Sequence, residues 1–169
     1  MANSLRNFLT GIGLSIGAVT GGVYIADFEG YSAQAYYDIA QKLSVCRGHT
    51  GSEIIIGKTY TEEECNALFA RDIKKADDAL LLLAPIPLSN GEHGAYLSFI
   101  FNLGEGNFAT STLRQKLLAG DRVGACYELT NACGKYGCNG WIYAHGIQWP
   151  GLASRRAKER QLCLSEITK

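Results

Sequence analysis

Hydrophobic and polar positions divide the chain into one long apolar segment followed by shorter periodic segments. Residues 7–26 carry no charge. As one helix this stretch would span roughly 30 Å at about 1.5 Å per residue, which matches the hydrocarbon core of a bilayer. Its five glycines, where a firmly held span would carry leucines, make partition into lipid marginal. We therefore expect an export signal that can leave the membrane, with a cleaved signal peptide and a permanent anchor as alternatives.

Beyond this segment the pattern changes to short strands and then to helices. Apolar runs around Ser44 and from Ser52 to Tyr60, separated by glycines, predict a small antiparallel sheet. Thr61 followed by Glu64 forms a capping box, and apolar residues at helical spacing then predict a long helix that ends before Pro85. Further helices are predicted over residues 92–103, 110–118 and 152–164, and after an N-cap at 121. The predicted fold class is α+β, mostly helical, with the sheet early in the sequence.

Length and charge restrict the classes of function. A chain of 169 residues can bury one sizeable core, and we expect a monomer. Lysine and arginine together number 16, the same as aspartate and glutamate. This balance argues against nucleic acid as a partner, because binding a polyanion requires an excess of positive charge.

Six cysteines without Cys-x-x-Cys spacing favour an oxidising compartment and disulfide bonds. Connectivity does not follow from sequence, although the loop ACGKYGCNG makes Cys133–Cys138 a natural local bridge. For the remainder we expect Cys46–Cys65 and Cys126–Cys163. A metal site formed by cysteines and histidines is the alternative.

Two carboxylates stand nine positions apart just after the apolar segment. Glu29 follows Phe28 and apolar sequence, whereas Asp38 lies in a more polar stretch. Acid/base cleavage of a glycosidic bond needs one carboxyl that is protonated and one that is ionised, and these surroundings suit that division. Ordinary surface carboxylates without a chemical role are the alternative on spacing alone.

Further residues extend this pattern into a family resemblance. The stretch EGYSAQAYYD, with Ser44 six residues after the aspartate and then CRGHTG, is similar to the E-x8-D-x5-T signature and following G-H of the phage-type lysozymes, glycoside hydrolase family 24. The segments GKTYTEEEC, SFIFNLGEGNFATSTL and WPGLASRRAKE continue the similarity along nearly the whole chain from Asp27. In particular, the chain resembles the exported branch whose first helix is a signal-arrest-release segment.

The resemblance implies a lysozyme-like fold and a division of the chain. A small antiparallel sheet lobe and a helical lobe would be joined by the long helix. Residues 1–26 would be the signal-arrest-release segment that becomes the first helix, and residues 27–169 the catalytic domain.

The resemblance also implies roles for three residues. Glu29 would be the general acid, Asp38 the carboxylate acting on the opposite face of the sugar, and Ser44 the hydroxyl that helps to hold the attacking water. Ser44 replaces the family's threonine, and the lost methyl group should loosen the water at a cost of about 1 kcal/mol or less. A carboxylate separation of roughly 6.5–9.5 Å would give inversion at the anomeric carbon, which the resemblance favours.

Three further positions match the family's pattern. Asn102 falls where the family places an amide in the cleft, and a helix-terminal amide satisfied locally is its alternative. Arg156 aligns with an arginine that pairs with the acid, although Arg155 could serve. His49 matches the G-H pair, and we expect it to support the hairpin by hydrogen bonding.

The expected function is that of a phage endolysin. It would be an N-acetylmuramidase acting on peptidoglycan, exported by the host machinery, tethered first to the inner membrane through residues 7–26 and then periplasmic. No cofactor is required, because the chemistry uses side chains and water. Two alternatives remain: a lytic transglycosylase, which needs only Glu29, and a non-enzymatic, membrane-anchored wall-binding protein.

Overall fold

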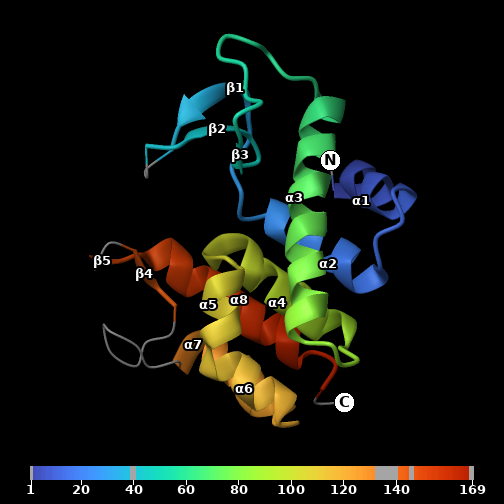
Figure 1. Ribbon diagram of the computed structural model, residues 1–169, viewed down its shortest axis with the longest axis vertical. Coiled ribbons are helices and arrows are strands. Elements are labelled where there is room, and N and C mark those ends of the chain that lie inside the picture. Colours follow the sequence, from blue (N-terminus) through green and yellow to red (C-terminus); the bar gives the residue numbers. More distant parts are fainter. Residues whose placement is uncertain (1, 39–40, 132–140, 145–146, 168–169) are drawn as a thin grey trace.

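Helix α3 (Glu62–Leu83) is the longest helix and joins a sheet lobe to a helical lobe (Figure 1). The structure is a computed structural model and describes residues 2–38, 41–131, 141–144 and 147–167. The sheet is antiparallel with strand order β1-β2-β3, namely β1 (Ser32–Tyr37), β2 (Leu43–Cys46) and β3 (His49–Thr50). The other elements are α1 (Ala2–Gly11), α2 (Ile16–Ala26), α4 (Asn90–Leu103), α5 (Glu105–Thr110), α6 (Thr112–Leu118), α7 (Arg122–Asn131), β4 (Tyr143–Ala144), β5 (Ile147–Gln148) and α8 (Pro150–Leu164). The predicted α+β class with one long connecting helix is confirmed.

The start of α3 follows from its capping box. The Thr61 hydroxyl accepts a hydrogen bond from the Glu64 backbone N–H at 3.2 Å, and the Glu64 carboxylate accepts one from the Thr61 N–H at 2.9 Å. These two bonds satisfy donors that a helix start otherwise leaves without partners. The helix ends at Leu83, ahead of Pro85, as predicted.

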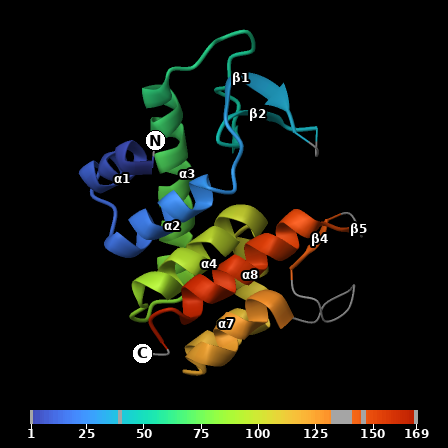
Figure 2. The same cartoon turned by 180° about the vertical axis from the view of Figure 1, so that it is seen from behind.

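Helix α4 forms the centre of the helical lobe. Its residues 91–100 are all buried, because α2, α3 and α8 pack around it. Figure 2 shows α8 running alongside α4, with α7 on its outer side. The helices predicted over 92–103, 110–118 and 152–164 are present within two residues at each end, and Asp121 caps α7 by accepting a bond from the Gly124 N–H.

One predicted strand is wrong, and another was missed. Residues 52–60 form turns rather than a strand, with a single bridge between Gln34 and Thr59. The run of isoleucines that suggested a strand does not alternate between faces, and Ile55 and Ile56 are 58% and 70% exposed. Gly57 then turns the chain with φ +84°. The first strand of the sheet is β1 (Ser32–Tyr37), which carries no β-branched residue.

The amino-terminal segment forms two helices where the sequence predicts one. Gly13 adopts φ +84°, and the Ser15 hydroxyl accepts a bond from the Ala18 N–H, so a new helix starts at Ile16 in a different direction. This break lets Leu5 and Leu9 of α1 enter the core. Within the described residues, no helix combines the length and apolar character needed to cross a membrane.

Glycines bring α2 close to α4. A Cβ atom at Gly21 would lie 3.0 Å from the Gly94 Cα and 2.8 Å from a Leu97 methyl carbon. A Cβ atom at Gly17 would lie 2.7 Å from the His93 ring. The two helices therefore pack at a distance that larger side chains at these positions would prevent.

Two predicted disulfides are present. Cys46–Cys65 joins β2 to α3 with a Cα–Cα distance of 5.2 Å, and Cys126–Cys163 joins α7 to α8 at 5.6 Å. The proposed Cys133–Cys138 bridge lies outside the described residues.

Candidate active site

Glu29 is held where α2 meets the sheet lobe. Its backbone N–H donates to the Ile25 carbonyl at 3.2 Å, which ties it to the last turn of α2. Its side chain is 21% exposed, and Oε1 accepts a hydrogen bond from Arg155 Nη1 at 2.9 Å. The other oxygen, Oε2, lies 3.4 Å from the point where a side chain at Gly48 would begin. Glu29 therefore has an arginine on one oxygen and the β2–β3 turn beside the other.

The expected surroundings and partner of Glu29 need correction. Sequence predicted an apolar environment, but the carboxylate is paired with a guanidinium. Arg155 makes this pair, whereas Arg156 is turned to Glu159 at 2.7 Å and Asn102 at 3.1 Å. Adjacent residues on a helix point about 100° apart, so only one of the two arginines can face the acid.

Asp38 stands at the turn between β1 and β2. Its Oδ1 accepts a hydrogen bond from the Lys42 N–H at 2.8 Å, and its own N–H donates to the Lys42 carbonyl at 2.9 Å. The side chain is half-buried. An N–H donor on one oxygen leaves Oδ2 free of any described partner within the protein and suits a group that accepts a proton.

Tyr36 relates the two acids to one another. Burial raises the pKa of the Tyr36 hydroxyl, and the negative charges of Glu29 and Asp38 raise it further. Tyr36 thus stands in an environment of negative charge to which both predicted acids contribute.

Ser44 lies in the central strand. It pairs with Tyr36 on one side and Thr50 on the other, and it is 1% exposed. Its hydroxyl donates to the Lys42 carbonyl at 3.3 Å. The hydroxyl is thus beside the Asp38 turn, and its part in holding a water stays a prediction.

His49 connects the hairpin to the long helix. The buried ring hydrogen-bonds through Nδ1 to Asp72 Oδ2 of α3 at 2.8 Å. Its Nε2 lies 3.3 Å from Arg71 and 3.4 Å from Glu53. These bonds support the hairpin, as the sequence predicts.

The second buried histidine, His93 of α4, hydrogen-bonds to Asp77 of α3. The sequence gave His93 no role, and His145 lies outside the described residues.

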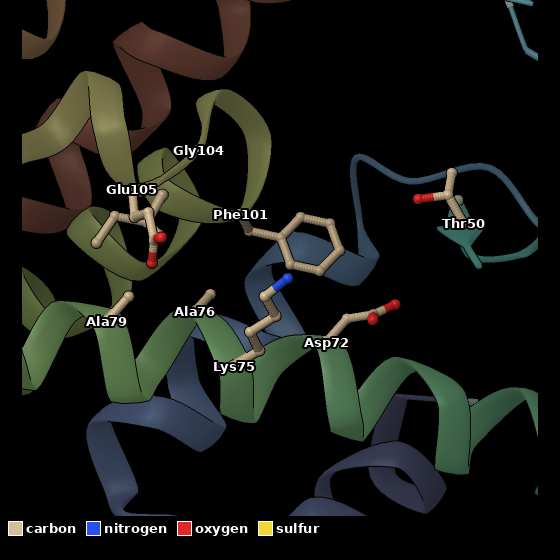
Figure 3. A pocket seen from close by; sticks show the side chains of 10 residues that line it. Thr50, Asp72, Lys75, Ala76, Ala79, Phe101, Gly104 and Glu105 are labelled. Carbon is tan, nitrogen blue, oxygen red and sulfur yellow. The ribbon is translucent and has the colours of Figure 1, made fainter. Parts of the chain in front are cut away.

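A cleft of about 320 Å³ opens between the two lobes (Figure 3). Gly48 and Thr50 line it from the sheet lobe and Phe101, Gly104 and Glu105 from the helical lobe. Along α3 its floor is formed by Asp72, Lys75, Ala76 and Ala79. Gly48 also borders Glu29 Oε2, so the acid lies next to a residue that lines the cleft. A cleft of this volume can hold a few sugar rings, but it is too small to hold a bulky polymer.

Sequence reasoning did not assign Tyr36, Gly48, Ser98 or Glu159, and it left Arg155 as a second choice. The signal for part of this set was present in the sequence. In RRxxE, the arginines and the glutamate are three and four positions apart, which places them on one face of a helix. Among the described residues, no group of three His, Cys, Asp or Glu side chains is arranged to hold a metal ion.

Comparison with known proteins adds to this geometry. Residues 26–159 match the phage lysozyme family. A SAR-endolysin of Bacteriophage PS119 is 39% identical over 166 residues, which covers 97% of this chain and 94% of the relative. The muramidase domain of SpmX from Asticaccaulis excentricus is 27% identical, with a TM-score of 0.71 over 85% of this chain and 94% of that domain.

A further solved structure bears on the fold alone. The active form of the P1 phage endolysin Lyz has a TM-score of 0.81 over 99% of this chain and 95% of that chain, at 19% identity. The sheet lobe, the long helix and the packed amino-terminal helices are thus a known arrangement. From the match over most of its length, the close relatives and this fold, the chain belongs to the phage lysozyme family and is a lysozyme-type glycoside hydrolase.

Proposed function

We propose that the protein is an N-acetylmuramidase that hydrolyses the β-1,4 bond between N-acetylmuramic acid and N-acetylglucosamine in peptidoglycan, using Glu29 and Asp38. One observation carries this assignment: Oε2 of Glu29 lies beside Gly48, a residue that lines the interlobe cleft. Family membership supports the reaction class. Glycoside hydrolysis requires two carboxyl groups, and Glu29 and Asp38 are the pair that the spacing along the chain supplies.

Each group has a defined task in the proposed step. Arg155 occupies Oε1 of Glu29, so Oε2 is the oxygen that carries the proton to the leaving sugar oxygen. Asp38 accepts a proton from the water that attacks the anomeric carbon as the glycosidic C–O bond breaks. Ser44 helps to orient this water by turning its hydroxyl away from the Lys42 carbonyl. The products are two sugar chains, one with a new reducing end.

The test compares three variants on purified peptidoglycan. Glu29→Gln keeps the size of the side chain but removes the transferable proton, and we expect a loss of about 100-fold or more in rate. Asp78→Asn, an exposed carboxylate on α3 paired with Lys74, is the matched control and should keep normal activity. A folded Glu29→Gln variant that still degrades the wall would remove Glu29 from its role.

Asp38→Ala separates hydrolysis from the transglycosylase alternative. A hydrolase should lose activity, and the wild-type products should be muropeptides with reducing ends when analysed by mass spectrometry. Anhydro products, or full activity without Asp38, would favour a lytic transglycosylase. The anomer released first, read by NMR, distinguishes inversion from retention.

We also propose that residues 7–26 tether the exported enzyme to the inner membrane of the host before release into the periplasm. The marginal hydrophobicity of the segment and the SAR-endolysin relatives support this route. Glu29 is bonded to the last turn of α2, so an α2 that lies in lipid takes the acid away from Asp38. The segment contains no cysteine, which favours a change of topology as the trigger. Equal peptidoglycan degradation by membrane-held and released protein would contradict this proposal.

A further inference from the structure

Helix α8 carries a buried charge cluster behind the proposed acid. Arg155, Arg156, Glu159 and Ser98 of α4 are each 5% exposed or less. A single oxygen, Glu159 Oε1, accepts three hydrogen bonds: from the Ser98 hydroxyl at 2.6 Å, Arg156 Nη2 at 2.7 Å and Arg155 Nε at 3.3 Å. Ser98 also accepts bonds from Arg155 Nε at 3.3 Å and Nη2 at 3.2 Å. Among the described residues, Arg155 is the member of the cluster that bonds to Glu29.

The charges in this cluster balance while Glu29 is ionised, before it takes up the proton that it delivers. Two guanidiniums face the Glu159 carboxylate inside the protein, and Glu29 supplies the second negative charge through Arg155. A buried guanidinium without acceptors is costly, and a carboxylate is the acceptor that also balances its charge. Burial lowers the pKa of Arg156, and the charge of Glu159 opposes this change.

The shorter contact decides how the carboxylates are shared. Arg156 lies 2.7 Å from Glu159 and is also bound to Asn102, whereas Arg155 lies 3.3 Å from Glu159 and 2.9 Å from Glu29. Arg156 thus takes most of the charge of Glu159. Arg155 is left to face the acid, while its Nε and Nη2 are anchored on Ser98.

We propose that Glu159 is a positioning residue: by engaging Arg156 it reserves Arg155 for Glu29 and sets which oxygen of the acid delivers the proton. Without Glu159, the charge of Arg156 is uncompensated and adds to that of Arg155 behind Glu29, which opposes uptake of the proton that the acid must deliver. Without Arg156, Glu159 draws Arg155 away from the acid. Activity therefore depends on the match between Glu159 and Arg156 rather than on either residue alone. This inference rests on the proposed role of Glu29.

A double-mutant cycle tests the proposal through kcat and KM on purified peptidoglycan. Glu159→Gln and Arg156→Gln should each lower kcat about tenfold or more while KM stays within about twofold, because substrate contacts are unchanged. The double variant, which removes both charges, should recover kcat to within about threefold of wild type. A merely structural role would restore the melting temperature in the double variant without restoring kcat, and that result would overturn the proposal.

Ser98→Ala covers the case in which Glu159→Gln does not fold. It removes the hydroxyl that joins Arg155 to Glu159 without leaving an unpaired charge. We expect kcat to fall about threefold to tenfold, with a loss of about 1–3 kcal/mol in stability that leaves the chain folded. Wild-type kcat in Ser98→Ala, or in folded Glu159→Gln, would overturn the proposal. Asp78→Asn is the control. Glu29→Gln in the same series separates the two hypotheses, since an active Glu29→Gln refutes the proposed function itself.

Discussion

The close packing of α2 on α4 provides a sharp test of how the acid reaches the cleft. Gly21→Ala adds one methyl group at this contact. That carbon would lie 2.8 Å from the Leu97 methyl carbon, 3.0 Å from the Gly94 Cα and 3.2 Å from the Gly94 carbonyl oxygen. The leucine can rotate, but the backbone of a fully buried helix cannot move without disturbing its other neighbours. The added methyl group should therefore push α2 away from α4.

The expected size of the effect follows from two opposing contributions. Overpacking a well-packed contact costs about 1–3 kcal/mol. Alanine in place of glycine inside a helix returns up to about 1 kcal/mol. We expect a net loss of about 1–2 kcal/mol, which corresponds to a fall of roughly 2–8 °C in melting temperature for a chain of this size. Because Glu29 is bonded to the end of α2, a displaced helix should also lower kcat between about tenfold and 100-fold.

Gly11→Ala is the matched control. Position 11 is the last residue of α1, and nothing lies within 4 Å of a Cβ atom there. Calorimetry and peptidoglycan turnover should leave this variant at or slightly above wild type. If Gly21→Ala and Gly11→Ala behave alike in both assays, the docking of α2 does not position the acid.

Three further predictions concern stability. Replacing the Cys46–Cys65 pair by alanine should cost about 3 kcal/mol in the free energy of unfolding, from the entropy of a loop of 19 residues; an unchanged denaturation midpoint would contradict this. Leu9→Ala should cost about 2–5 kcal/mol, because this side chain is fully buried, whereas Leu82→Ala at a 79% exposed position should be nearly neutral. Burial alone would raise the pKa of Glu92, but hydrogen bonds from Arg122 of α7 and from the Ser89 backbone N–H outweigh this effect and lower the pKa. The ionised Glu92 carboxylate therefore stabilises the fold at neutral pH. This stabilisation should be lost as the pH falls below about 4.3, the unfolded-state pKa, and through the lower folded-state pKa. Glu92→Gln should make the melting temperature less dependent on pH in this acid range.

The helical part of the fold could be predicted because local rules agree with tertiary packing there. Thr61 and Glu64 fix the start of α3 through backbone bonds that depend on four consecutive residues, and Asp121 does the same for α7. The sheet was harder. Strand β1 is stabilised by pairing with β2 rather than by its own composition. The isoleucine run at 54–56 has the composition of a strand, but two of its side chains face solvent.

The site shows the same division between local and non-local information. Glu29, Asp38 and Ser44 could be proposed because their spacing along the chain is itself the family's signature. The choice between Arg155 and Arg156 depends on the rotation of α8 about its axis when it packs against α4, and sequence spacing does not determine that rotation. Gly48 lies beside Glu29 from the sheet lobe, so this proximity depends on how the two lobes close on each other.

The break between α1 and α2 has a consequence for the timing of lysis. The two helices contain 10 and 11 residues, so each is only about 15–17 Å long, roughly half of a bilayer's hydrocarbon thickness. On the proposed membrane route, re-entry into lipid would require Leu5 and Leu9 to leave the core and the break at Gly13 to straighten before any new contact forms. Release from the membrane would therefore be effectively irreversible for each molecule. The time of release would then determine when that molecule begins to degrade the wall.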